Sequence, residues 1–137
     1  MKTIEVVAAI IHKNGRILAA QRGYGDYKDG WEFPGGKVQP GESAEAAIVR
    51  EIREELRVTI KPEKLVTTVE YDYPTFHLTM HCFISSIVEG EIELVEHEAM
   101  RWLTPNALDE VDWLPADVEV VQELTKFLSE LRQKPEK

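Results

Sequence analysis

The stretch that decides the fold covers residues 35–58 and reads GGKVQPGESAEAAIVREIREELRV. Glycines and a proline punctuate its first part, which predicts a loop, and the residues from Ser43 onward predict a helix with Ser43 as its N-cap. Glu51, Glu54 and Glu55 are related as i, i+3 and i+4, so they fall on one face of that helix. An adjoining face carries the apolar residues that must be buried, namely Ile48, Val49, Ile52 and Leu56.

Three carboxylates on one helical face repel one another, and each like-charged pair costs roughly a few tenths of a kcal/mol. We therefore expect a cation beside them. Hard divalent ions such as Mg²⁺ take oxygen ligands and keep positions that a phosphate can fill. For the three glutamates taken alone, the alternative is a solvated acidic face.

The loop and the helix together resemble the signature of the Nudix hydrolases, which cleave nucleoside diphosphates linked to a further group. Chance does not explain agreement at so many fixed offsets. The matching residues are Gly36, Glu42, Arg50, Glu51, Glu54, Glu55 and Val58. Arg57 departs from the signature, which has glycine there. The residue just past a helix often takes a positive φ, which costs a non-glycine residue roughly 1 kcal/mol.

This resemblance implies Mg²⁺ or Mn²⁺ as the cofactor and hydrolysis of a phosphoanhydride by water. The implied metal ligands are Gly36, Glu51, Glu54, Glu55 and Glu96. Glu96 is chosen because it stands six residues before Trp102, as the loop glutamate of the family does, and Glu98 is close enough to compete. The implied catalytic residues are Glu51, Glu54, Glu96 and Arg50. Glu51 is also a candidate general base, with Glu96 as its rival, and Arg50 orients Glu51.

The whole chain resembles the small MutT-like nucleoside triphosphate pyrophosphohydrolases, and within them the CTP pyrophosphohydrolase branch. That likeness rests on residues 4–11, 20–22, 31–33 and 114–117. It implies that water attacks an inner phosphate and releases a nucleoside monophosphate and pyrophosphate. The implied substrate contacts are Arg22, Phe33, Lys37, Met80 and Asp117, with Trp31 as a further apolar wall.

Asp117 matches the position that reads the edge of the base. An ionised aspartate only accepts hydrogen bonds, so it favours a base with an amino donor, such as cytosine. Simpler roles remain open: Asp117 can cap the last helix, Phe33 and Met80 can pack in the core, and Lys37 can be solvated. Phe76 stands where the 8-oxoguanine enzyme carries an arginine, which weakens the transfer of that specificity.

We therefore expect Mg²⁺-dependent hydrolysis of (d)CTP or of a modified pyrimidine nucleoside triphosphate. The alternative enzyme is an 8-oxo-dGTP diphosphatase of the MutT type, because an aspartate can also accept from purine N–H groups. The alternative of another class is a non-catalytic nucleotide-binding sensor, for which so costly a carboxylate cluster has little use.

The composition limits the number of domains and the kinds of partner that the chain can have. With 137 residues and 43% hydrophobic content, the chain suits one domain spanning residues 1–137. Its net charge of −9 argues against a nucleic-acid polymer or an anionic membrane as partner. The only cysteine, Cys82, lies in an alternating apolar run, which predicts a buried thiol. Residues 6–11 are too short to span a bilayer, and Glu5 argues against a signal peptide. We expect a cytoplasmic enzyme, either a monomer or a homodimer.

The remaining elements indicate a mixed fold. Strands are predicted over residues 3–12, 16–21, 65–73, 77–87, 91–94 and 100–103. An Asn14-Gly15 turn joins the first pair, residues 22–30 predict a mobile loop, and Lys61-Pro62 predicts a break. A helical turn is expected after Thr104, an amphipathic helix from Ala116, and a frayed tail over residues 133–137. This order indicates an α/β (α+β) chain, and the resemblance selects the Nudix fold, a mixed β-sheet sandwiched between α-helices.

Overall fold

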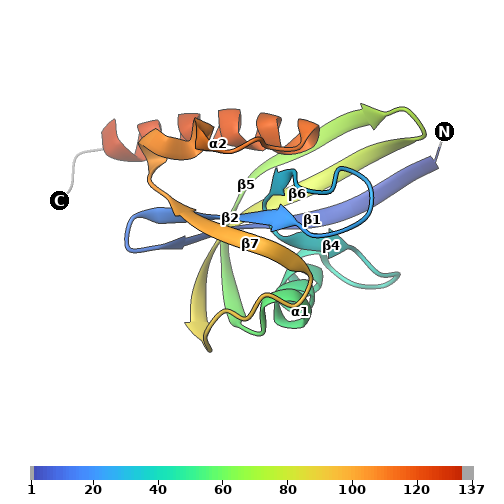
Figure 1. Ribbon diagram of the computed structural model, residues 1–137, viewed down its shortest axis with the longest axis horizontal. Coiled ribbons are helices and arrows are strands. Elements are labelled where there is room, and N and C mark those ends of the chain that lie inside the picture. Colours follow the sequence, from blue (N-terminus) through green and yellow to red (C-terminus); the bar gives the residue numbers. More distant parts are fainter. Residues whose placement is uncertain (1, 134–137) are drawn as a thin grey trace.

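The computed structural model describes residues 2–133, in which a mixed sheet lies between two helices (Figure 1). Its elements in chain order are β1 (Lys2–Lys13), β2 (Arg16–Arg22), β3 (Trp31–Glu32), β4 (Gly35–Lys37), α1 (Ala44–Leu56), β5 (Thr59–Tyr73), β6 (Phe76–Glu89), β7 (His97–Leu103), the 3₁₀ helix η1 (Pro105–Glu110) and α2 (Pro115–Gln133). None of the described helices has the length and apolar character needed to cross a membrane.

Strand β1 is the centre of the sheet. On one edge it pairs in parallel with β6 along most of its length, from Lys2 opposite Phe76 to Ile11 opposite Ser85. Its other edge is shared, because β4 pairs with the middle of β1 and β2 pairs with its end in a tight hairpin. Strand β2 in turn pairs with β3 and β7, and β5 closes the far edge beside β6.

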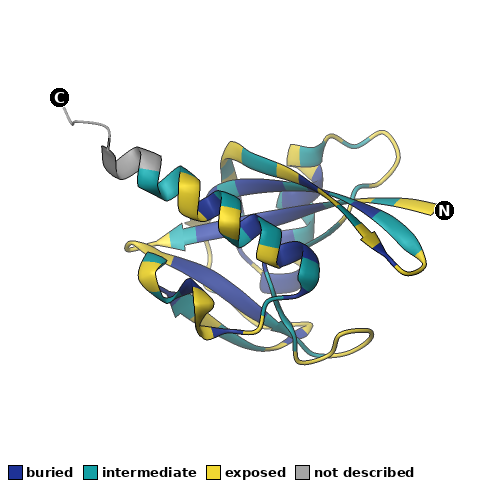
Figure 2. Cartoon of the chain, turned by 90° about the horizontal axis from the view of Figure 1, so that it is seen from above, coloured by how far each residue is buried: buried dark blue, intermediate teal, exposed yellow. Residues whose placement is uncertain are grey.

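The two faces of β1 are covered by different helices. Ala8 and Ile10 belong to the core beneath α2, which also contains Val120 and Leu124 of that helix. The alternate residues of β1 belong to the core beneath α1, which contains Val7, Ala9, Ile11, Ala47, Ile48, Ile52 and Leu56. Figure 2 shows the central strands buried and the strand tips and loops exposed. The predicted mixed sheet between helices is confirmed.

Helix α1 begins as its sequence predicts, and it ends in a left-handed turn. The Ser43 hydroxyl oxygen accepts a hydrogen bond from the backbone N–H of Ala46 at 3.1 Å, which makes Ser43 the N-cap. At the other end Arg57 takes φ 62° and ψ 24°, and its N–H donates to the carbonyl of Arg53. The turn that usually has glycine is therefore made by an arginine in the left-handed conformation.

Several predicted strands are confirmed. Asn14 and Gly15 both have positive φ, 53° and 76°, as a type I′ hairpin turn requires. The strands predicted over residues 16–21, 77–87 and 100–103 lie within β2, β6 and β7. The turn after Thr104 is a 3₁₀ helix, and the amphipathic helix begins at Pro115. Of the predicted tail, Gln133 closes α2, and residues 134–137 lie outside the described residues.

Two predictions about the strands are wrong. Lys61-Pro62 does not end a strand, because β5 runs on through it with a register shift between Pro62 and Lys64. An edge strand and a bulge are the places where a sheet tolerates proline. Residues 91–94 form no strand; the N–H of Glu93 instead donates to the carbonyl of Leu56. This segment satisfies carbonyls at the end of α1, which an unpaired helix terminus needs.

Candidate active site

The guanidinium of Arg50 is the hub of the exposed side of α1. It donates to both carboxylate oxygens of Glu42, at 2.8 and 3.0 Å, and to the Oε1 atoms of Glu51 at 2.9 Å and Glu54 at 3.2 Å. It also donates to the carbonyl of Lys37 at 3.0 Å. The hydrogen bonds from Arg50 hold the pKa of Glu42 down to about 2. Arg50 thus ties the loop to the helix and fixes the direction of the Glu51 carboxylate.

Glu55 lies on the same helix but is buried, with only 8% of its surface exposed. Its Oε2 atom has no hydrogen-bond partner among the described residues. Burial, together with the negative charges of Glu96, Glu51 and Glu32, raises the pKa of Glu55 to about 9. A buried carboxyl group without a partner is costly, and it is a common sign of a functional site.

The structure separates the two candidate loop glutamates. Glu96 lines the same cavity as Glu55, together with the loop that joins β2 to β3. Glu98 does not line this cavity, and its carboxylate lies 3.7 Å from Nζ of Lys28 on the same loop. Of the two, Glu96 is therefore the one that can act together with Glu55.

These residues fit a hard divalent cation. Gly36 lies against Glu51 so closely that a methyl group at Gly36 would collide with the carboxylate. The donor set consists of oxygen atoms, and one of them, Oε2 of Glu55, is buried and unpaired. Within residues 2–133, no three His, Cys, Asp or Glu side chains already converge on one point. Arg50 holds Glu51 and Glu54, so the metal ligation stays a prediction.

A second part of the site is a largely apolar cavity of about 250 Å³. All five residues predicted to contact the substrate line it: Arg22, Phe33, Lys37, Met80 and Asp117. Phe33 stacks on Trp113 at 4.5 Å between ring centroids, and Tyr73 stacks on Phe76 at 5.0 Å. The prediction that Trp31 forms a wall is wrong, because it lies outside this lining and its backbone pairs with Asp112 and Leu114 instead.

Asp117 lies in the first turn of α2 and is buried, with 5% of its surface exposed. Its Oδ1 atom accepts a hydrogen bond from the backbone N–H of Phe33 at 3.0 Å, so the side chain ties α2 to the residue after β3. Burial raises the pKa of Asp117 to about 8. The prediction of an ionised carboxylate at Asp117 is wrong: with a pKa of about 8, the carboxyl group is largely protonated near neutral pH and can donate as well as accept.

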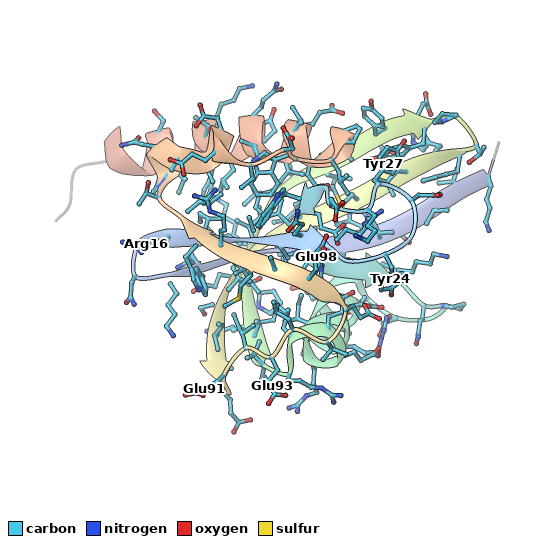
Figure 3. The ribbon with its side chains drawn as sticks, viewed as in Figure 1. Arg16, Tyr24, Tyr27, Glu91, Glu93 and Glu98 are labelled. Carbon is cyan, nitrogen blue, oxygen red and sulfur yellow. The ribbon has the colours of Figure 1, made fainter. Side chains whose placement is uncertain are left out.

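A carboxylate-lined cavity borders the apolar cavity. A cavity of about 400 Å³ is lined by Glu55, Glu96 and the β2–β3 loop, and it shares Arg22, Glu32 and Gly35 with the apolar cavity. Figure 3 shows Tyr24 and Tyr27 on that loop, at the opposite end of β2 from Arg16. Together the two volumes fall within the roughly 300–1,000 Å³ of typical ligand sites.

Comparison with known proteins agrees with this geometry. The NUDIX domain family matches residues 1–124. The chain belongs to the Nudix family. It is 37% identical over 123 residues to the CTP pyrophosphohydrolase of Escherichia coli, covering 89% of this chain and 91% of that protein. It is 31% identical over 129 residues to the 8-oxo-dGTP diphosphatase of the same organism, covering 93% and 100%.

Solved structures show the same fold. The solution structure of the E. coli ORF135 protein has 34% sequence identity and a TM-score of 0.84, covering 98% of this chain and 96% of that chain. A MutT NUDIX hydrolase from Burkholderia pseudomallei has 27% identity and a TM-score of 0.83, covering 91% and 100%. This Nudix chain is therefore a hydrolase, and Nudix hydrolases generally use divalent metal cations.

Sequence reasoning missed two residues of this Nudix site. Glu32 lines both cavities and accepts a hydrogen bond from Arg22 at 2.6 Å. His97 is buried beside it and donates to Glu32 at 2.9 Å. The only signal in the sequence was the position of His97 directly after Glu96; nothing local shows that side chains of β3 and β7 meet.

Proposed function

We propose that this Nudix hydrolase is a Mg²⁺-dependent nucleoside triphosphate pyrophosphohydrolase that converts (d)CTP, or a modified pyrimidine nucleotide, to the monophosphate and pyrophosphate. One observation carries the proposal. The apolar cavity and the carboxylate-lined cavity share Arg22, Glu32 and Gly35, so a base and a polyphosphate can occupy one continuous site.

The metal would be held by the carbonyl of Gly36 and the carboxylates of Glu51, Glu54, Glu55 and Glu96. When bound, Mg²⁺ neutralises charge on the phosphate oxygens and makes water a better nucleophile. The chain supplies the rest. Arg50 fixes Glu51 in place, and Glu51 or Glu96 takes the proton from the attacking water. Arg22 on the wall that the two cavities share, and Lys37 on the wall of the apolar cavity, are the cationic contacts for phosphate.

The protonation of Asp117 supports a cytosine base. A neutral carboxyl group accepts through one oxygen and donates through the other. The pairing edge of cytosine offers the complement, an amino donor beside a ring-nitrogen acceptor. The corresponding edge of guanine or 8-oxoguanine offers two adjacent donors, which suit an ionised carboxylate instead. The pKa of about 8 at Asp117 therefore favours cytosine at neutral pH.

The second candidate is an 8-oxo-dGTP diphosphatase. The likeness to the E. coli enzyme of that name, over the whole length of that protein, favours it. Phe76 and Tyr73, which close the apolar cavity with stacked rings, offer no charged group to an 8-oxo substituent. Because the chain is a hydrolase, it is not a non-catalytic sensor.

Turnover of a nucleotide panel with Mg²⁺ tests this assignment. The panel contains CTP, dCTP, dUTP, dGTP and 8-oxo-dGTP, and the products are identified by chromatography. We expect the highest kcat/KM for CTP or dCTP, with the monophosphate and pyrophosphate as products. A strong preference for 8-oxo-dGTP would overturn the pyrimidine assignment, and release of orthophosphate would overturn the cleavage position. We place this activity in the cytoplasm, in a monomer or a homodimer of one-domain chains.

A further inference from the structure

His97 begins a hydrogen-bonded chain that crosses three strands. Its side chain is 4% exposed, and its Nε2 atom lies 2.9 Å from Oε2 of Glu32. A carboxylate only accepts, so this nitrogen carries the hydrogen. The other oxygen of Glu32, Oε1, accepts from Nη2 of Arg22 at 2.6 Å. The chain runs from β7 through β3 to the end of β2.

A β-bulge creates this alignment. The register pairs Gln21 with Ala99, so regular pairing would place Glu98 opposite Arg22. The register shifts between Gln21 and Arg22, and Arg22 pairs with His97 instead. The bulge turns Glu98 out toward Lys28 and turns His97 in toward Glu32. Bulges near active sites commonly redirect a side chain in this way.

Close packing holds the β2–β3 loop against the start of β7. A methyl group at Gly23 would come within 2.7 Å of the Glu96 carbonyl oxygen, so the absence of a side chain lets the β2–β3 loop lie directly on the start of β7. Arg22 is held at a second point, because its Nη1 atom donates to the carbonyl of Asp26 at 2.9 Å. The guanidinium that borders both cavities is thus fixed from two sides.

Burying the imidazole of His97 here costs free energy of folding. Its Nδ1 atom is buried and has no partner among the described residues. Folding alone would be better served by an apolar side chain, because an unpaired buried polar atom costs free energy. Burial would raise the pKa of Glu32, but the hydrogen bond from His97 and the charge of Arg22 outweigh it, and the pKa lies below its usual value. Glu32 therefore stays ionised, as a partner for Arg22 should.

We infer that His97 is a positioning residue for nucleotide binding: it holds Glu32 so that Glu32 presents Arg22 to the phosphates at the mouth shared by the two cavities. This rests on the proposed function, since it assigns Arg22 to the nucleotide. A preorganised arginine binds phosphate with less loss of side-chain freedom. Removing the donor at Nε2 should loosen Arg22 and weaken nucleotide binding without changing the reacting groups.

Two substitutions separate this role from simple packing. His97→Leu keeps apolar bulk and removes the donor, and His97→Gln keeps a donor near the position of Nε2. We expect His97→Leu to raise KM about tenfold with kcat changed less than about threefold, and His97→Gln to recover most of that loss. His81→Leu is the matched control. It removes a half-buried histidine that bonds Glu5 and Thr68 away from the site, and KM should stay unchanged.

A second substitution tests whether His97 acts through Arg22. In an Arg22→Ala protein, His97→Leu should raise KM by less than about twofold more, because residues in one network are not additive. The same order of effects is expected in the dissociation constant of an α,β-methylene nucleotide analogue, measured by calorimetry with Mg²⁺. If His97→Leu does not fold, His97→Phe, which also lacks a donor at Nε2, is measured in its place, with the same expected rise in KM.

The outcomes are distinct. An active wild-type enzyme with unchanged KM in His97→Leu, or with fully additive effects in the Arg22→Ala background, overturns this inference alone. So does a His97→Gln variant as impaired as His97→Leu. A wild-type protein that neither hydrolyses nor binds any nucleotide of the panel overturns the proposed function and this inference with it.

Discussion

Replacing Glu55 with glutamine measures what the buried carboxyl group costs the fold. Burial, followed by the charges of Glu96 and Glu51, raises its pKa from 4.5 to about 9. In the unfolded chain the group ionises near pH 4.5, so above that pH folding must bind a proton, and stability falls as the pH rises toward 9. At pH 7 the difference spans 2.5 pH units, which gives a ceiling of about 3 kcal/mol at 1.36 kcal/mol per unit.

Glutamine does not ionise, so metal-free Glu55→Gln should be more stable than wild type at pH 7. We expect a gain of about 1 to 3 kcal/mol, since an unpaired amide N–H offsets part of the ceiling. At pH 5 the gain should shrink to less than about 1 kcal/mol, because the unfolded glutamate is then only partly ionised. The assay is urea unfolding in EDTA, followed by tryptophan fluorescence.

Glu54→Gln is the control for this experiment. Its side chain is 58% exposed, and we expect a change of less than about 0.5 kcal/mol at either pH. With saturating Mg²⁺ the order should reverse, because only the wild type gains the full stabilisation of a bound ligand. A Glu55→Gln protein that is less stable than wild type without metal at pH 7, or equally stabilised at pH 5 and pH 7, would refute the reasoning.

Four further outcomes are expected. Glu54→Gln should lower kcat by about two orders of magnitude or more at saturating Mg²⁺ and leave the unfolding midpoint unchanged; undiminished turnover would remove Glu54 from the metal site. Arg57→Gly should raise the free energy of unfolding by about 0.5 to 1 kcal/mol, because it relieves a non-glycine residue at φ 62°, and a loss of stability would contradict this. For the wild type, kcat/KM with dCTP should fall as the pH rises through about 8, where Asp117 ionises, while Asp117→Asn shows no such step. Burial raises the pKa of the Cys82 thiol, so a thiol reagent should label it only after unfolding, and rapid labelling of the folded protein would contradict its burial.

Local sequence patterns predicted the central part of this structure. Helical periodicity placed Glu51, Glu54 and Glu55 on one face and the N-cap at Ser43, because both depend only on neighbouring residues. The Asn14-Gly15 turn was predictable for the same reason. The strand break predicted at Pro62 is wrong. The missing N–H of proline ends a strand only where a neighbouring strand would accept a hydrogen bond from it. Whether such a neighbour exists depends on the strand order, which the local sequence does not show.

What sequence reasoning could not reach depends on contacts between distant elements. His97 and Glu32 meet because β2 pairs with both β3 and β7 and carries a bulge, and no spacing within the chain shows this. Similarly, Asp117 has a side chain that ordinarily ionises. Its pKa of about 8 arises only when α2 docks on the sheet and removes the carboxyl group from water.

The position of β1 has a consequence for how the chain must fold. Its ten-residue parallel ladder with β6 cannot form until residues more than seventy positions further along have arrived. Until then the apolar run from Val6 to Ile11 has only the short strand β4 beside it on one edge, and its other edge is open, which is the situation that favours association between unfinished chains. Pairing over such long separations also makes for slow folding, so we expect this protein to reach its native state in milliseconds to seconds and not in microseconds.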